Sequence, residues 1–348
     1  MKLKKLSDQV VLITGASSGI GLTTARMAAK QGARLVLVSR DQDALDQLAE
    51  ELRQQGIEAL ACAADVGNQE DVQRVAQQAT ERFGRIDTWI NNAGISIFGK
   101  HEEIALEDAQ RLFQTNFWGV VHGSLEAVRI MKERGGALIN LGSEVSDRAV
   151  PLQGMYSASK HAVKGFTDSL RMELEKDKLP ISVTLIRPAA IDTMFTVHAK
   201  NYMDKEPALP PPIYAPELVA DAILYAAQHP KRDVFVGGAS KAVSVGSHHM
   251  PRVFDKYMEM SMFKQQQSEQ MSSPNRRDAL HAPDPDNALR QRNGANGHHV
   301  AEHCPYTAVS LRSKPILLTA LIGGAALLGA WSYQRRGGTL RSALAAFR

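Results

Sequence analysis

The chain has 348 residues, of which 44% are hydrophobic and 22% are charged, and its formal net charge is +4. This length can form one α/β domain of roughly 250 residues and leaves about a hundred residues over. Nucleic-acid binding would require a clustered basic face, and the predicted domain has no such run. The two cysteines, Cys62 and Cys304, lie far apart in the sequence and exclude a disulfide framework.

The first five residues include three lysines, as the start of a secretory signal does. The apolar stretch that follows is interrupted by Asp8 and ends at a glycine-rich loop, which argues against a signal peptide. We therefore expect no secretory signal and a main domain that stays in the cytosol.

Short β-rich runs alternate with longer helical patterns over the first 240 residues. Because most of the runs are rich in Val, Ile and Leu without polar alternation, they predict parallel strands covered by helices on both faces. The predicted strands are residues 10–13, 34–38, 58–63, 88–90, 137–141, 182–186 and 233–236. The helical patterns between them include residues 20–31, 42–55, 69–82 and 158–175. The pattern predicts a doubly wound α/β domain with about seven strands.

The first predicted strand runs directly into Thr14-Gly15-Ala16-Ser17-Ser18-Gly19-Ile20-Gly21, and a helical pattern follows. Glycines at such a turn allow a sharp bend and let backbone N–H groups approach a pyrophosphate at the positive end of the helix. The order of strand, loop and helix indicates a Rossmann-type dinucleotide site.

The end of the second strand should meet the adenosine ribose of the dinucleotide. An acidic side chain there favours NAD, whereas this sequence has Ser39 and Arg40. A guanidinium pairs well with a phosphate, so these residues predict NADP. We expect the next residue, Asp41, to face solvent or to begin the following helix.

Tyr156 and Lys160 stand four residues apart in a helical pattern and therefore share one face. A free tyrosine has a pKa of about 10, and a nearby ammonium lowers it toward the working range. Ser143 lies 13 residues before Tyr156 in the sequence, at the end of a predicted strand, where its hydroxyl could bind a substrate oxygen. These three residues predict proton transfer to or from a carbonyl or alcohol.

Six motifs occur in a fixed order along residues 5–240. They are Thr14-Gly-x-x-x-Gly19-x-Gly21, Asp65 after the third strand, Asn91-Asn92-Ala93-Gly94, Asn116, Ser143, and Tyr156-x-x-x-Lys160. In these motifs the chain resembles the short-chain dehydrogenase/reductase family. The resemblance implies that the protein is an oxidoreductase that transfers hydride between a nicotinamide and a carbonyl or hydroxyl carbon.

The resemblance also implies roles for individual residues. Tyr156 would be the general acid/base, Lys160 would bind the nicotinamide ribose, Ser143 would orient the carbonyl, and Asn116 would hold a proton-relay water. The implied cofactor-binding residues are Gly15, Ser17, Ser18, Gly19, Ile20, Gly21, Ser39, Arg40, Asp65, Val66, Asn92, Ala93, Gly94, Tyr156, Lys160, Pro188, Ile191 and Thr193. Ala189 replaces the glycine that usually follows the proline in this family.

The segment 194–214 should form the mobile lid over the substrate, which varies most within such folds. Together with Ser143 and Tyr156, we expect Met194 and Phe195 to contact the substrate. The apolar residues of this segment suit a lipid-like ketone or aldehyde, and they equally suit ordinary packing, since most pockets are apolar. The segment 239–263 predicts a partly apolar helix whose partner the sequence does not identify.

The composition changes after residue 263. Residues 264–314 are rich in Gln, Ser, Asn, Asp, Pro and Arg, which predicts a flexible linker. His298, His299, His303 and Cys304 lie within it, but no second pair of ligands follows at the spacing of a zinc finger, so we expect no metal site.

Residues 316–333 carry no charge, and basic residues flank them on both sides. At roughly 1.5 Å per residue this helix would span about 27 Å, close to a hydrocarbon core of about 30 Å. We expect a single transmembrane helix over residues 315–334 and a basic tail over 335–348, after a catalytic domain over 1–263 that lies on the cytoplasmic side.

The leading hypothesis is a membrane-tethered NADPH-dependent reductase that acts on a hydrophobic carbonyl or alcohol. A reductase of soluble carbonyls such as acyl thioesters is an alternative, and a non-catalytic NADP-binding sensor or scaffold is another. The family resemblance also implies a homo-oligomer, and the charge distribution predicts no nucleic-acid partner.

Overall fold

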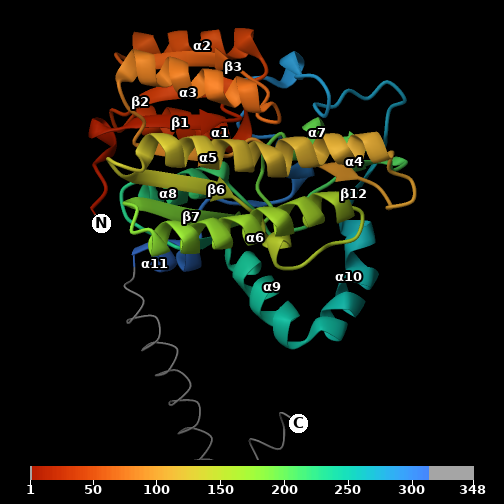
Figure 1. Ribbon diagram of the computed structural model, residues 1–348. Helices are drawn as coiled ribbons and strands as arrows, with labels where there is room; N and C mark the ends of the chain where they lie inside the picture. Colours follow the sequence, from red (N-terminus) through yellow and green to blue (C-terminus); the bar gives the residue numbers. More distant parts are fainter. Residues whose placement is uncertain (1, 313–348) are drawn as a thin grey trace, which may run out of the picture. The chain divides into compact units, whose positions relative to one another are not determined.

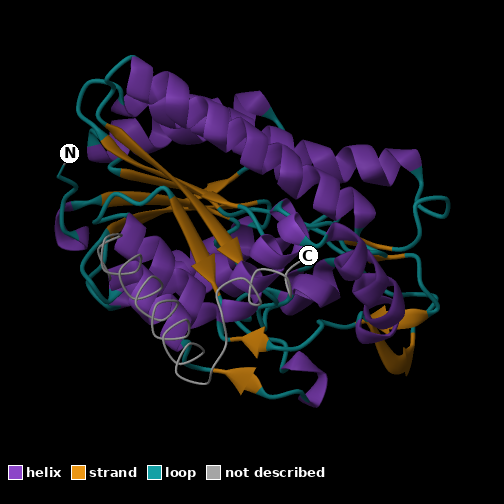
Figure 2. Cartoon of the chain, turned by 90° about the horizontal axis from the view of Figure 1, so that it is seen from below, coloured by secondary structure: helices purple, strands orange, loops and turns teal. Residues whose placement is uncertain are grey.

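The computed structural model describes residues 2–312, and its centre is a seven-stranded parallel sheet in the order β11-β7-β6-β4-β1-β2-β3. The strands are β1 (Val10–Thr14), β2 (Arg34–Ser39), β3 (Ala59–Ala63), β4 (Thr88–Asn91), β6 (Gly136–Leu141), β7 (Ile181–Pro188) and β11 (Asp233–Val236). Helices lie on both sides of this sheet (Figure 2). The doubly wound α/β fold and the seven strands are confirmed.

The principal helices are α1 (Gly19–Ala29), α2 (Gln42–Gln54), α3 (Gln69–Phe83), α4 (Leu106–Phe113), α5 (Gly119–Met131), α6 (Gly154–Lys176) and α8 (Pro216–Ala226). Helix α1 packs against α8, and α3 packs against α5. Asp41 is the N-cap of α2, where its side chain accepts a hydrogen bond from the Ala44 N–H at 3.0 Å. Asp41 thus begins the next helix, one of the two roles expected for it.

The central strands are buried along their whole length. Every residue of β1, β4, β6 and β7 is buried, as the continuous apolar runs predicted. Strand order reverses between β1 and β4. Strands β2 and β3 lie on one side of β1, and the chain then crosses to the other side of β1 to form β4. In such sheets ligands bind at the carboxyl ends of the strands beside this reversal.

Three small sheets lie outside the central one. They pair β5 (Ile97–Phe98) with β8 (Lys200–Asn201), β9 (Lys205–Pro207) with β12 (Gln267–Met271), and β10 (Ile213–Tyr214) with β13 (Val300–Ala301). Helix α7 (Phe195–His198) follows β7, helices α9 (Gly238–His249) and α10 (Pro251–Gln265) form a hairpin, and α11 is Pro305–Arg312 (Figure 1).

The structure differs from the expected flexible linker over residues 264–314. One compact unit extends to Thr307, and β12 and β13 pair with strands of the preceding segment. Polar side chains hold this part of the chain in place. Arg276, for example, pairs with Glu206 at 2.9 Å and donates to the carbonyl oxygens of Thr196 and Val197. Composition alone failed here because the segment is ordered by polar contacts to distant residues together with a few buried apolar side chains such as Leu280.

The expected transmembrane helix over residues 315–334 and the tail over 335–348 lie outside the described residues. Among residues 2–312, no helix has the length and apolar character needed to cross a membrane.

Candidate active site and cofactor cleft

The three predicted catalytic side chains converge at the carboxyl end of β6. Tyr156 lies in the first turn of α6, Lys160 lies one turn later on the same face, and Ser143 follows β6. The Ser143 hydroxyl donates a hydrogen bond to the Tyr156 hydroxyl. The Lys160 ammonium donates to the Leu141 carbonyl oxygen at 2.8 Å and lies 5.8 Å from the centre of the Tyr156 ring.

The environment of these groups changes their pKa values. Burial lowers the pKa of Lys160 to about 8, because the ammonium loses hydration. Burial also raises the pKa of Tyr156, and the hydrogen bond from Ser143 only partly opposes this effect. We expected the nearby ammonium to lower the pKa of Tyr156, and the desolvation of a buried phenolate outweighs that effect. The phenol is therefore held protonated, in the form that donates a proton to a carbonyl oxygen.

Asn116 lies in the π-helical turn Gln114–Trp118, between α4 and α5. Its amide group donates to the Ile95 carbonyl at 2.9 Å and to the Ser159 hydroxyl at 3.1 Å, and it accepts from the Ile95 N–H at 2.8 Å. Ile95 follows β4 and Ser159 precedes Lys160. Asn116 therefore fixes the loop after β4 relative to the catalytic helix.

The glycine-rich loop has the close approaches that only glycine allows. Gly15 and Gly19 have φ values of +68° and +51°. A Cβ on Gly21 would lie 2.0 Å from the Gly15 carbonyl oxygen, so no side chain fits there. The side chain of Asn92 donates to the Thr14 carbonyl at 2.8 Å and ties the end of β4 to the loop after β1.

A single cleft of about 390 Å³ contains nearly all the predicted site residues. Gly21 and Asn116 are the two that do not line it; the former lies behind the loop and the latter behind the catalytic helix. The predicted residues that line it are Gly15, Ser17, Ser18, Gly19, Ile20, Ser39, Arg40, Asp65, Val66, Asn92, Ala93, Gly94, Ser143, Tyr156, Lys160, Pro188, Ile191, Thr193, Met194 and Phe195.

Two arginines mark the end of the cleft where β2 and β3 finish. The guanidinium of Arg40 donates to the carbonyl oxygens of Ala279 and Leu280, the latter at 3.1 Å. Arg111 from α4 forms an ion pair with Asp65 at 2.5 Å and also donates to the Leu280 carbonyl. The sequence predicted Arg40 and Asp65 at this end of the cleft and did not predict Arg111.

A segment that the sequence analysis did not connect with the site closes one side of the cleft. We call residues 279–295 the strap. The Leu289 N–H donates to the Ser17 carbonyl at 2.8 Å, and the Gly19 N–H donates to the Arg290 carbonyl at 3.0 Å. Oδ1 of Asp192 accepts from three successive N–H groups of the strap at 2.9–3.1 Å, those of Asn293, Gly294 and Ala295.

Where the strap faces α7, the partly buried His198 and the buried Asp284 line the cleft. The His198 Nε2 atom and an Asp284 carboxylate oxygen lie 3.8 Å apart. Nε2 and the other carboxylate oxygen, Oδ1, are buried without a hydrogen-bond partner among the described residues. Burial lowers the pKa of His198, and Asp284 only partly opposes this, so the imidazole is neutral at pH 7.

The opposite end of the cleft, beyond Tyr156, is apolar. Phe195 packs edge-on against Tyr156, with ring centres 5.2 Å apart, and Met194 is buried beside it. Met258 and Met262 of α10 line the same end. The segment that the sequence left unplaced thus forms α9 and α10, and α10 contributes to the substrate side of the cleft.

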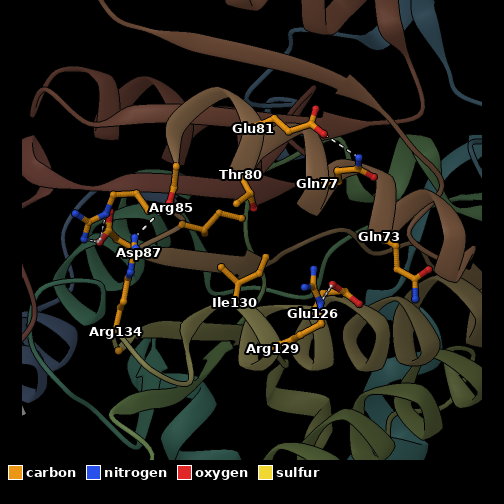
Figure 3. A pocket seen from close by; sticks show the side chains of 13 residues that line it. Gln73, Gln77, Thr80, Glu81, Arg85, Asp87, Glu126, Arg129, Ile130 and Arg134 are labelled. Carbon is orange, nitrogen blue, oxygen red and sulfur yellow. Dashed lines mark hydrogen bonds and ion pairs between the residues drawn. The ribbon is translucent and has the colours of Figure 1, made fainter.

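A second cavity, of about 690 Å³, lies between α3 and α5 (Figure 3). Four of its ionic side chains form pairs: Arg85 with Asp87, and Arg129 with Glu126 at 2.8 Å. Asp87 precedes β4, which places this cavity at the amino ends of the strands. None of the predicted site residues lines it.

Comparison with known proteins decides the family. The sequence pattern described as short chain dehydrogenase matches residues 9–203, more than half of the chain. The chain belongs to the short-chain dehydrogenase/reductase family. It is therefore an oxidoreductase with a nucleotide-binding Rossmann domain, and NAD or NADP is the cofactor typical of this family.

One relative extends over nearly the whole chain. An uncharacterized oxidoreductase of Bacillus subtilis, YxnA, is 46% identical over 97% of this chain and 93% of its own length. The 11-beta-hydroxysteroid dehydrogenase A of Sesamum indicum is 37% identical over 55% of each chain. The similarity to YxnA therefore includes much of the sequence beyond the Rossmann domain.

Solved structures share the fold. An alcohol dehydrogenase from Thermococcus sibiricus, complexed with 5-hydroxy-NADP, has a TM-score of 0.58 and 29% identity, covering 65% of this chain and 95% of its own. A short chain dehydrogenase/reductase from Burkholderia phymatum in complex with NAD has a TM-score of 0.64 and 25% identity, covering 78% of this chain and all of its own.

Proposed function

We propose that this protein is an NADPH-dependent reductase of hydrophobic, lipid-like ketones or aldehydes. The observation that carries the proposal is the position of Ser143 and Tyr156 between a polar dinucleotide cleft and an apolar wall formed by Met194, Phe195 and α10. The protonated Tyr156 phenol is suited to reduction, because the alkoxide that develops from a carbonyl oxygen needs a proton.

The residues present fit a dinucleotide. The loop after β1 is a cradle that any side chain at Gly21 would fill, and unpartnered polar atoms of His198 and Asp284 line the cleft. Backbone N–H groups of Ser17 to Ile20 would hold the pyrophosphate at the start of α1. When bound, the cofactor supplies the hydride.

Residues of this chain would orient the carbonyl, donate the proton and bind the nicotinamide ribose. Ser143 orients the carbonyl oxygen by a hydrogen bond, and Tyr156 donates the proton from its hydroxyl to that oxygen. Lys160, fixed through the Leu141 carbonyl, would bind the nicotinamide ribose and offer its positive charge beside Tyr156. Phe195 shields the reacting atoms from water.

The preference for NADP rests on the end of β2. Arg40 lines this end of the cleft, and Arg111 lies beside it in an ion pair with Asp65. Asp278 is a further carboxylate whose charge acts on Arg40. These guanidinium groups favour an additional phosphate on the adenosine ribose, because a guanidinium pairs well with a phosphate.

The activity test measures NADPH oxidation by the full-length protein in detergent with hydrophobic and water-soluble carbonyls, beside Tyr156→Phe. Turnover of hydrophobic carbonyls that Tyr156→Phe loses would support the proposal. Turnover confined to acyl thioesters or other soluble carbonyls would support the first alternative. Tight NADPH binding without any turnover would favour a sensor or scaffold.

We further propose that residues 315–334 anchor the protein in a membrane, with the catalytic domain on the cytoplasmic side. The uncharged sequence 316–333 and its basic flanks support this. Membrane fractionation of the full chain and of a chain ending at residue 312 tests it. A full chain that stays in the supernatant after lysis without detergent would contradict it.

We also propose a homo-oligomer formed through α5 and α6. Trp118 before α5, Leu125 on α5 and Met172 on α6 are exposed large apolar side chains (46%, 51% and 60%). Light scattering of wild type and of the double variant Leu125→Glu, Met172→Glu tests this. A wild-type chain that is monomeric at micromolar concentration would contradict it.

A further inference from the structure

One carboxyl group in the cleft has no role in proton transfer as derived above. Glu144 follows Ser143 directly, in the short 3-10 turn Glu144–Ser146 that Ser143 caps. This turn packs against α6 and α9, and Glu144 itself lines the cleft. Glu144 thus lies one residue from a group that contacts the reacting oxygen.

Two arginines around this turn, Arg148 and Arg187, are paired with other carboxylates, and Lys160 donates to the Leu141 carbonyl. Arg148, which also lines the cleft, forms an ion pair with Asp255 of α10. Arg187 of β7 pairs with Asp147 at 2.7 Å and with Asp233 at 3.0 Å. Burial raises the pKa of Glu144 to about 7, and no neighbouring cation opposes this effect.

An unpaired, partly buried carboxyl group costs free energy in the folded protein, because it gives up hydration without a compensating partner. Such groups in clefts commonly meet a ligand. The neighbouring wall is apolar, with Val145, Met258 and Met262. A polar group on the substrate close to its carbonyl carbon would therefore find Glu144 as its partner.

We propose that Glu144 is a specificity-determining residue, which accepts a hydrogen bond from a hydroxyl or ammonium group on the substrate next to the reacting carbonyl. The substrate class is then a hydrophobic ketone or aldehyde with an adjacent hydrogen-bond donor. This inference rests on the proposed carbonyl reductase function and restricts its substrate class.

The test compares α-hydroxyacetophenone with propiophenone, which has a methyl group in place of the hydroxyl and therefore has nearly the same shape but lacks the donor. We expect wild type to prefer the hydroxy ketone by about tenfold or more in kcat/KM, as sites that bind a substrate hydroxyl do. Glu144→Ala should reduce this ratio to within about twofold, a change of roughly 1 kcal/mol or more in discrimination. Glu133→Ala, which removes an exposed carboxylate elsewhere, should leave the ratio unchanged.

Glu144→Gln distinguishes the two donors. Its amide oxygen still accepts from a hydroxyl, so the preference for α-hydroxyacetophenone should partly return. The preference for α-aminoacetophenone should not return, because the variant lacks the negative charge. A wild-type enzyme without preference for either donor, or a Glu144→Ala enzyme that keeps the preference, would overturn the proposal.

A measurement without turnover separates this inference from the proposed function. Calorimetry follows binding of α-hydroxyacetophenone and propiophenone to Tyr156→Phe loaded with NADPH, with and without Glu144→Ala. Tighter binding of the hydroxy ketone that depends on Glu144 supports the inference even if no ketone is reduced. Equal binding overturns the inference and leaves the reductase proposal intact.

Discussion

The backbone N–H of Leu289 donates to the Ser17 carbonyl at 2.8 Å, so the strap is joined to the first loop of the Rossmann domain. The neighbouring bond from Gly19 to Arg290 repeats this connection on the other side of the loop. A dinucleotide in the cleft would thus be enclosed by the glycine-rich loop on one side and the strap on the other.

Asp192→Ala should loosen the strap. Three N–H groups lose their shared acceptor, and hydrogen bonds to a carboxylate contribute about 1.5–3 kcal/mol each. We expect NADPH to dissociate about tenfold or more faster and the strap to be cleaved sooner in limited proteolysis. Stopped-flow fluorescence measures the release rate.

Asp192→Asn is the matched variant, because it keeps one acceptor oxygen at nearly the same position. It should lie between wild type and Asp192→Ala in release rate. Release rates that are the same in all three proteins would show that the strap does not retain the cofactor.

Arg40→Ala should shift the cofactor preference. Removal of one of two guanidinium groups at the adenosine end should raise the KM for NADPH by about tenfold or more, since each charged hydrogen bond contributes about 1.5–3 kcal/mol. The KM for NADH should change by less than about threefold on the same argument. Steady-state kinetics with both cofactors checks this. An equal rise in KM for NADH and NADPH would show that Arg40 only holds the strap and does not contact the additional phosphate of NADPH.

The pKa of Lys160 predicts an alkaline limit to activity. Burial lowers it to about 8, so the ammonium is lost as pH rises through 8. We expect kcat/KM of the wild type to fall above about pH 8. In Lys160→Arg the guanidinium stays charged, so the remaining activity of that variant should not fall over this pH range. A wild-type profile that stays level to about pH 10 would contradict the assignment.

Glu144 predicts a pH dependence of stability. Its pKa rises from 4.5 to about 7 on folding, so the folded state binds more protons than the unfolded state between these values. The stabilisation is present below about pH 4.5 and is lost as pH rises through 7. Relative to Glu144→Gln, wild type should lose about 1–3 kcal/mol of unfolding free energy between about pH 5 and pH 8. Urea denaturation at the two pH values measures the difference, and a constant difference would contradict it.

Local patterns allowed much of the fold and site to be predicted. Continuous apolar runs mark the buried strands, and the glycine loop and the Tyr156–Lys160 spacing are contained in short stretches of chain. The strap and the role of α10 could not be found in this way. Residues 279–295 are held by backbone hydrogen bonds to positions far away in sequence, and their polar composition resembles that of a disordered segment. The pKa of Tyr156 was misjudged because burial is a property of the folded state.

The strap is held to the Rossmann domain by hydrogen bonds to Ser17 and Asp192. Because these bonds join positions far apart in the sequence, they can form only late in the synthesis of this part of the chain. The β-strands of the central sheet are complete once Val236 has been added, more than 40 residues before the strap begins. A nascent chain can therefore form its sheet and catalytic helix while one wall of the nucleotide cleft is still on the ribosome. Retention of the dinucleotide becomes possible only after the strap has been synthesised, which makes the cofactor a late participant in maturation relative to the sheet.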